Sequence, residues 1–244
     1  MRNVKLELCY DGTRYRGWQR QPNSDNTIQG KLEQTLSRIL EEDVEISGSG
    51  RTDTGVHALL QVANFHCKSG LSCEEICNQL RRYLPGDIGI YSCKDVSQRF
   101  HARLNAKTKT YRYRLWNSTL PCVFERGYVT VYPQPLDVEA MKIAASHLIG
   151  THDFSAFCAN KHMKKSTIRT IYAITIEHTG PEIHFTVTGN GFLHHMMRIL
   201  VGTLVEVGIN QRSAESIPML FGAPRCEAGL LMEPEGLCLM EVTY

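Results

Sequence analysis

The order of two kinds of hydrophobic periodicity in the first hundred residues constrains the fold more than any other feature. Apolar and polar residues alternate over 4–10, as in a strand with one buried face. Apolar residues then recur at helical spacing over 28–41, with Asn26 as the expected N-cap and Gln29 at the capping-box position. A strand followed by a helix is therefore the predicted start of the fold.

Three further strands and one helix complete the pattern. The strands are predicted over 44–47, 60–67 and 88–93, and the helix over 72–83, just before a Pro-Gly pair. The resulting order, βαββαβ, is typical of a ferredoxin-like (RRM-like) unit, in which two helices cover one face of an antiparallel sheet.

The second half of the chain repeats this order more loosely. Strands are predicted over 109–116, 127–132, 170–177, 183–188 and 237–242, and helices over 136–148, 194–207 and 214–220. We therefore expect an α+β protein with two ferredoxin-like halves, residues 1–100 and 101–244. Two antiparallel sheets joined edge to edge would leave a central cleft, which is a usual place for a catalytic site.

Composition is consistent with a folded cytoplasmic protein. The chain has 244 residues, of which 42% are hydrophobic, and this is enough for a packed core. Residues 1–12 contain no long apolar run, so we expect neither a signal peptide nor a membrane span. The nine cysteines include no Cys-x-x-Cys pair, which favours reduced, buried thiols over disulfides or a zinc site.

Positive charge is unevenly distributed although the net charge is only +2. No Asp or Glu occurs in 96–124 or in 154–176. These stretches carry Arg99, Arg103, Lys107, Lys109, Arg112, Arg114, Lys161, Lys164, Lys165 and Arg169. They are candidate surfaces for RNA phosphates. The alternative is that they are strand faces whose acidic partners come from elsewhere in the fold.

One carboxylate stands out in the loop that joins the second and third predicted strands. Asp53 is the only acidic residue between Glu45 and Glu74, and it lies in a segment with three glycines, 47–58. Glycines allow a tight turn and a close approach to a ligand, and an Asp beside Arg51 can stay ionised as a nucleophile or base. The alternative is that Asp53 caps a turn.

Five groups of short motifs follow one another along the chain. They are Tyr10-Asp11-Gly12-Thr13 with Gly17-Trp18-Gln19, Gly50-Arg51-Thr52-Asp53-Thr54-Gly55-Val56-His57-Ala58, Phe100-His101-Ala102-Arg103, Lys109-Thr110-Tyr111-Arg112-Tyr113, and Gly189-Asn190-Gly191-Phe192-Leu193 with Met197-Arg198. Together they resemble the motifs of the bacterial tRNA pseudouridine synthase A family. The resemblance implies a homodimer that isomerises uridines thirty-eight to forty in the anticodon stem-loop of tRNA, without a cofactor or metal. It also implies that the RNA lies across the cleft.

The same resemblance assigns roles to individual residues. Asp53 would act on the sugar or base, Tyr111 would stack on the target base and assist proton removal from C5, and Arg198 would pair with Asp53. Substrate-binding roles fall to Tyr111, Arg51, Thr52, His57, Phe192, Leu193 and Arg103. From the residues alone, Arg51 could hold the carboxylate ionised, bind a phosphate or replace a flipped base, and His57 could be merely structural. Tyr113 is expected to pack across strands.

Two departures from the family pattern and two rival functions remain to be weighed. His194-His195 replaces an aromatic residue followed by a polar one, and Thr54 replaces a common Ala. A metal at the histidine pair is not expected, because neighbouring helix positions face different directions.

Asp53-Thr54-Gly55 also matches the short signature of aspartic proteases, but helices are predicted here. The more serious rival is a non-catalytic RNA-binding module, in which a lone loop carboxylate would repel phosphate.

Overall fold

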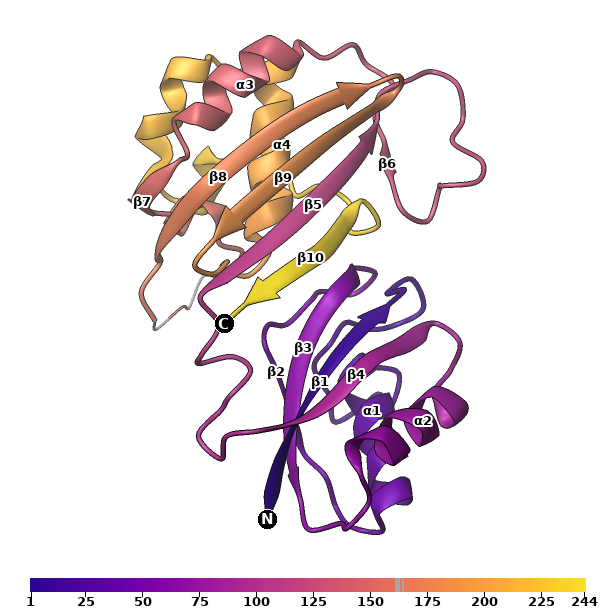
Figure 1. The fold of residues 1–244 in the computed structure, drawn as a ribbon. Helices are drawn as coiled ribbons and strands as arrows, with labels where there is room; N and C mark the ends of the chain where they lie inside the picture. The colour runs from indigo at the N-terminus through magenta and orange to yellow at the C-terminus, as the bar shows by residue number, and fades with distance from the viewer. Residues whose placement is uncertain (161–162, 164) are drawn as a thin grey trace. The chain divides into compact units, whose positions relative to one another are not determined.

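A computed structural model describes residues 1–160, 163 and 165–244, and it divides the chain into two compact units (Figure 1). The first contains residues 1–107 and 239–244, and the second contains residues 108–238. These limits differ from the predicted 1–100 and 101–244, because the end of the chain returns to the first unit. The Lys107 N–H donates to the Thr243 carbonyl (2.9 Å), and the Tyr244 hydroxyl donates to the Ala102 carbonyl (2.7 Å).

The first unit has the predicted βαββαβ order. Its elements are β1 (Arg2–Tyr10), α1 (Ile28–Leu40), β2 (Ile46–Gly48), β3 (His57–Cys67), α2 (Cys73–Tyr83) and β4 (Ile88–Val96). The strands pair antiparallel in the order β4-β1-β3-β2. Every second residue of β1 from Val4 to Tyr10 is buried, and α1 buries its apolar stripe from Ile28 to Leu40. Alternating and helical periodicities therefore identified the core correctly.

The start of α1 corrects one prediction. The N-cap is Thr27 and not Asn26, because the Thr27 side chain accepts the Gly30 N–H (3.1 Å). Gln29 does not complete a capping box. Its amide is buried instead, where it accepts the Arg20 N–H (3.1 Å) and donates to Glu33 (2.8 Å). Helix α2, in contrast, begins with a complete capping box.

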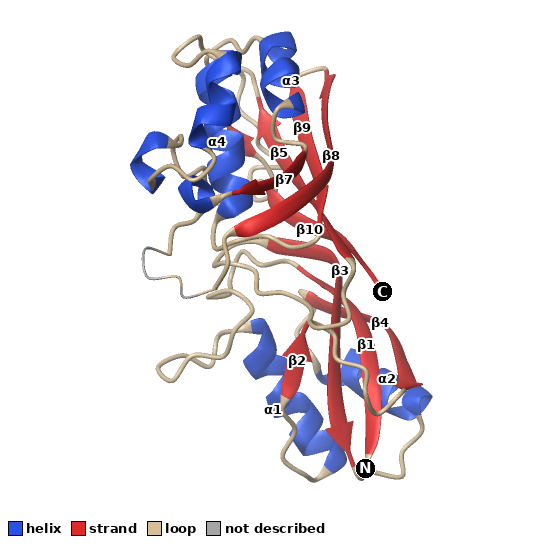
Figure 2. Ribbon diagram, turned by 90° about the vertical axis from the view of Figure 1, so that its left-hand side faces the viewer, coloured by secondary structure: helices blue, strands red, loops and turns tan. Residues whose placement is uncertain are grey.

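The second unit is also α+β, with more short elements (Figure 2). The elements of this unit are β5 (Thr108–Trp116), β6 (Thr130–Val131), α3 (Val138–Ser146), β7 (Gly150–Asp153), η1 (Ser155–Phe157), β8 (Ile168–Thr179), β9 (Glu182–Gly189), α4 (Met196–Gly208), η2 (Ala214–Leu220) and η3 (Arg225–Glu227). Strand β10 (Leu237–Thr243) begins in this unit and continues in the first. The sheet order is β5-β9-β8-β7, with β6 parallel to β5.

Short elements account for the differences from prediction in this unit. The strand expected over 127–132 is only two residues long, β7 was not predicted, and 214–220 forms a 3-10 helix that contains Pro218. Helix α4 matches its prediction closely, and all of its residues except Glu206 are buried. A helix that is buried on all sides belongs in a core, and α4 packs there against α3, β5 and η1.

Two further expectations concern the thiols and the membrane. None of the nine cysteines, all of which lie in the described part of the chain, forms a disulfide, but only four of them are buried, and Cys226 is exposed. The expectation of buried thiols is therefore right for fewer than half of them. Among the described residues, no helix combines the length and the apolar character needed to cross a bilayer.

Candidate active site

Asp53 begins a tight turn in the loop between β2 and β3. The Val56 N–H donates to the Asp53 carbonyl (3.2 Å), and Gly55 has φ +78°, the value that position i+2 of a type II turn requires. Asp53 is half-buried and Thr54 is exposed. The turn therefore carries the Asp53 side chain at the edge of the first unit's core.

The back of this loop is pressed against the segment that follows β1. A Cβ on Gly17, which has φ +85°, would lie 2.6 Å from the Thr52 carbonyl oxygen. A Cβ on Gly12 would lie 2.0 Å from the Val56 carbonyl oxygen. The Trp18 N–H donates to the same Thr52 carbonyl (3.0 Å). Only glycine allows the two segments to approach this closely, so Gly12 and Gly17 determine how near the Asp53 loop lies to the segment after β1.

Buried polar side chains hold the same loop from below. Gln61 of β3 accepts the Ser49 hydroxyl proton through Oε1 and donates through Nε2 to the Gly50 carbonyl (3.1 Å). The Tyr10 hydroxyl and Thr52 Oγ1 are 2.8 Å apart, and Gln61 Nε2 lies 3.4 Å from that tyrosine oxygen. Gln61 and Ser49 are fully buried. We call Tyr10, Ser49, Thr52 and Gln61 the loop-support network.

Sequence reasoning did not identify Tyr10 and Gln61 as functional. A signal was present, because Gln61 is the polar residue within an otherwise apolar run of β3, residues 58–63. A buried amide of this kind must find hydrogen-bond partners, and here the partners are in the Asp53 loop. Thr52, predicted to bind substrate, is itself buried and bonded to Tyr10.

His57 lies behind the loop. It is buried, and its Nδ1 accepts the Gly12 N–H (3.1 Å) while lying 3.2 Å from Asp11 Oδ1. This bond joins the end of the loop to the segment after β1, which is the structural role that the sequence left open.

Arg51 and Arg103 are both exposed on the first unit. Arg103 belongs to a short turn in which the Asn105 N–H donates to the His101 carbonyl (3.0 Å). The Asn64 side chain fixes that turn by accepting the Ala102 N–H (2.8 Å). The two arginines therefore extend from ordered backbone, as contacts to phosphate require.

In the second unit, Tyr111 and Phe192 meet. Tyr111 lies in β5 opposite Val187 of β9 and is buried. Its ring and that of Phe192 are 5.1 Å apart in an edge-to-face arrangement of 81°. The loop that carries Phe192 is tied to Thr170 of β8 by two hydrogen bonds with Asn190, each 3.0 Å. The structure thus brings together two of the predicted base-binding residues.

Arg198 is buried in α4 and is held by its own unit. Its Nε donates to the Met232 carbonyl (2.5 Å), and the Met232 N–H donates back to the Arg198 carbonyl (3.4 Å). A Cβ on Gly202 would lie 2.0 Å from the Leu230 carbonyl oxygen, so the segment before Met232 lies directly on the helix. This segment fixes the orientation of the guanidinium group.

Tyr113 and the two histidines have different local roles. Tyr113 is fully buried, and its hydroxyl oxygen lies within hydrogen-bonding distance of Thr130 Oγ1 (2.6 Å) and of the Glu233 carbonyl oxygen (2.8 Å). Burial raises the pKa of Tyr113 well above its usual range. The buried position agrees with the expected packing role. His194 and His195 do not face different directions: their rings are 3.7 Å apart, because His195 has φ +62° and precedes α4 as its N-cap.

The acid-free stretches are only partly available for RNA. Arg114 forms ion pairs with Glu182 (2.9 Å) and Glu125 (3.0 Å), so acidic partners from elsewhere do account for it. Arg169 bonds to backbone carbonyls next to it. Lys161 and Lys164 lie outside the described residues.

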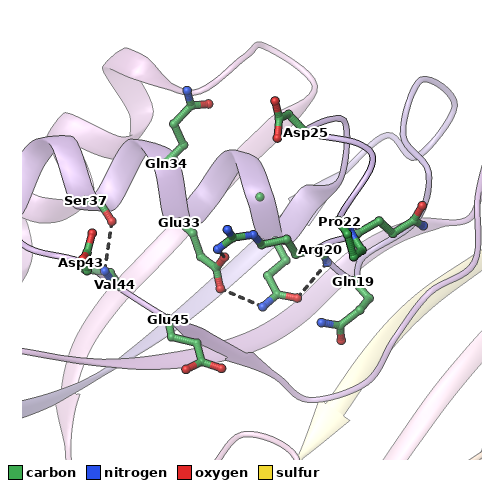
Figure 3. A pocket seen from close by; sticks show the side chains of 13 residues that line it. Gln19, Arg20, Pro22, Asp25, Glu33, Gln34, Ser37, Asp43, Val44 and Glu45 are labelled. Carbon is green, nitrogen blue, oxygen red and sulfur yellow. Dashed lines mark hydrogen bonds and ion pairs between the residues drawn. The ribbon is translucent and has the colours of Figure 1, made fainter.

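A cavity of about 1060 Å³ lies beside α1 in the first unit (Figure 3). Its charged lining consists of Asp25, Glu33, Asp43 and Glu45, with Arg20 as the cation. Four carboxylates would repel a phosphate backbone. This charge disfavours RNA in the cavity, and none of its lining residues belongs to the Asp53 loop.

Comparison with known proteins decides the family. The family model described as tRNA pseudouridine synthase matches residues 9–105 and 144–244. The chain belongs to the tRNA pseudouridine synthase family. It is 45% identical to tRNA pseudouridine synthase A 2 of Bacillus cereus and 44% identical to tRNA pseudouridine synthase A of Thermoanaerobacter pseudethanolicus, in each case over 100% of both chains. The predicted family is confirmed, and with it the enzyme class, an isomerase that converts uridine to pseudouridine in tRNA. The aspartic-protease alternative is excluded.

Proposed function

We propose that this synthase modifies uridines thirty-eight to forty in the anticodon stem-loop of tRNA, with Asp53 as its catalytic carboxylate. The observation that carries the assignment of Asp53 is the construction of its loop. Residues 49–52 are held by the loop-support network and by Trp18, while Asp53 begins a glycine turn at the edge of the core. A reacting group held by a rigid backbone is what catalysis by positioning requires.

The reaction breaks the C1′–N1 bond of uridine and forms a C1′–C5 bond. The Asp53 carboxylate either adds to the sugar or base or removes a proton from the sugar, and both routes need the ionised form. The detached uracil rotates, C5 bonds to C1′, and the C5 proton is then lost to a base. Release of that proton is therefore a direct readout of isomerisation.

Tyr111, Phe192 and Leu193 supply the proposed base pocket. The edge-to-face contact of Tyr111 with Phe192 presents an apolar surface on which a flipped uracil can stack. Leu193 is buried next to Phe192. The Tyr111 hydroxyl is the proposed acceptor of the C5 proton.

Arg198 is proposed as the partner that keeps Asp53 ionised. A buried guanidinium is costly unless carboxylates or carbonyls satisfy it, and the Met232 carbonyl accepts one hydrogen bond from its Nε. This pairing stays a prediction, as do RNA contacts by Arg51 and Arg103. Thr52 and His57 support the loop from its buried side.

A homodimer in the cytoplasm is the proposed working form. Support for an interface comes from the segment between β5 and β6, where Leu120 is 71% exposed and Phe124 is 95% exposed. Exposed apolar side chains this close in sequence are typical of contact surfaces. Sedimentation of the purified protein would establish its oligomeric state.

Tritium release from tRNA labelled at C5 of uridine tests the function. The wild-type protein and Asp53→Asn are compared under single-turnover conditions, with binding of the same tRNA measured in parallel. We expect release by the wild type alone, with tRNA binding retained by the variant. Release by Asp53→Asn at the wild-type rate would refute the role of Asp53. Absence of release by both, with binding intact, would favour the RNA-binding module.

A further inference from the structure

Cationic and aromatic side chains gather on the two helices of the first unit. They are Arg38 near the end of α1 and Arg81, Arg82 and Tyr83 at the end of α2, and we call them the arginine–tyrosine patch. The guanidinium carbon of Arg38 lies 4.6 Å from the centre of the Tyr83 ring, and that of Arg82 lies 5.5 Å from it. The two guanidinium groups are thus within about 10 Å of each other, roughly one Debye length at 0.1 M salt.

The charge of the patch is not neutralised within the protein. In the part of the chain that the structure describes, none of the three arginines forms an ion pair with a carboxylate. Arg81 bonds instead to the carbonyls of Ile90 (2.9 Å) and Tyr91 (2.8 Å), which carry no net charge. All three arginines are exposed, and Tyr83 is 46% exposed. Two positive charges, those of Arg38 and Arg82, therefore face solvent at one ring, and Arg81 adds a third exposed charge at the end of the same helix as Arg82.

Helix stability alone does not explain this arrangement. Cations in the last turn of a helix interact favourably with its dipole, and each of these arginines has such a position. That effect acts within one helix, however, and does not require arginines of two helices to converge on one ring. The convergence of the arginines creates repulsion between like charges, and an anion bound between them would offset that repulsion.

We propose that the arginine–tyrosine patch binds the phosphate backbone of tRNA, as a contact separate from the active site. This inference rests on tRNA as the substrate in the proposed function. Guanidinium groups bind phosphate oxygens through two parallel hydrogen bonds, and the Tyr83 ring holds two of these groups close together. An acidic polypeptide would match the charge, but tRNA is the polyanion on which the enzyme acts. No residue of the patch belongs to the Asp53 loop, so binding there adds affinity without altering the chemical step.

The test compares Arg38→Gln/Arg82→Gln with the wild type in tRNA binding at several salt concentrations and in steady-state isomerisation. Each lost phosphate contact reduces the slope of log affinity against log salt by about 0.7 to 0.9, so we expect a decrease of roughly 1.5 for the pair. We expect affinity near physiological salt to fall on the order of tenfold, with a similar rise in KM and an unchanged kcat. Arg38→Lys/Arg82→Lys should keep most of the salt slope.

A charge-matched control uses Lys68→Gln/Lys142→Gln, which removes two exposed cations outside the patch. It should leave the salt slope at the wild-type value. An unchanged slope and KM in the Arg→Gln pair would overturn the proposal. Equal losses in the Gln and Lys pairs, together with a lower melting temperature, would assign the arginines to folding and also overturn it. The salt slope is measured by binding alone, so it stands apart from the question whether the protein isomerises uridine.

Discussion

Replacement of Gln61 by Leu tests whether the loop-support network positions Asp53. The variant removes the acceptor of the Ser49 hydroxyl and the donor to the Gly50 carbonyl, both on the buried side of the loop. Two net hydrogen bonds are worth about 1 kcal/mol each, and the partly buried Gly50 carbonyl, left without its donor, adds up to about 2 kcal/mol. We therefore expect the free energy of unfolding to fall by about 2 to 4 kcal/mol, as measured by urea denaturation.

The effect on catalysis should exceed the effect of lost stability. Without Gln61 the backbone before Asp53 is free to shift, and a displacement of about 1 Å at a reacting group costs up to 10²-fold in rate. We expect single-turnover tritium release to slow roughly 10- to 100-fold at a temperature where the variant remains folded. Because Gln61 is buried beneath the loop, tRNA affinity should change little.

A core variant of similar instability separates the two effects. Ile76 is fully buried in α2 and contributes no hydrogen bond to the loop, and Ile76→Ala should cost about 2 to 4 kcal/mol. This variant should keep the wild-type rate of tritium release. The reasoning is refuted if Gln61→Leu retains that rate, or if Ile76→Ala loses as much.

Two further variants test the glycine contact and one ion pair. Gly17→Ala places a Cβ 2.6 Å from the Thr52 carbonyl oxygen at φ +85°, so we expect a lower melting temperature and slower tritium release; a wild-type value for both would contradict the close approach. Arg114, and to a smaller extent His184, hold the pKa of the Glu182 carboxyl below its usual range. The stability that this carboxylate contributes is therefore fully present above the unfolded pKa, near 4.5, and is lost as pH falls through the lower folded pKa. Glu182→Gln should therefore lose less stability than the wild type on acidification below about pH 5, and parallel unfolding curves would show that the ion pair contributes nothing.

The elements that sequence predicts well are those with one clear buried face. Apolar residues recur at every second position in β1 and at helical spacing in α1, and most residues of α4 are apolar. In these elements the local sequence pattern therefore agrees with the burial seen in the fold. The two-residue strand β6 is too short to show a period. The N-cap was misplaced because Asn26 and Thr27 are both good N-caps, and only the burial of Gln29 decides between them.

Site residues divide in the same way. Asp53 could be proposed from the sequence because a single carboxylate in a glycine-rich loop is conspicuous. The sequence shows that Gln61 is polar within an apolar run, but its role depends on the proximity of Tyr10 and Ser49, which only the fold reveals. Arg38 and Tyr83 were missed for a related reason: each is an ordinary surface residue until two helices bring them together.

The construction of the Asp53 loop also indicates which sequence changes the enzyme can tolerate. Gln61, Tyr10 and Trp18 bond to residues 49–52, whereas Asp53 itself begins the turn that follows. Precision at the carboxylate thus comes from side chains and a backbone N–H that need not touch the RNA. Substitutions in this buried support should change the rate of the chemical step more than tRNA affinity, and substitutions at exposed arginines should do the reverse. The separation follows from the physics of each contact, because buried hydrogen bonds fix geometry while exposed charges mainly exchange counterions.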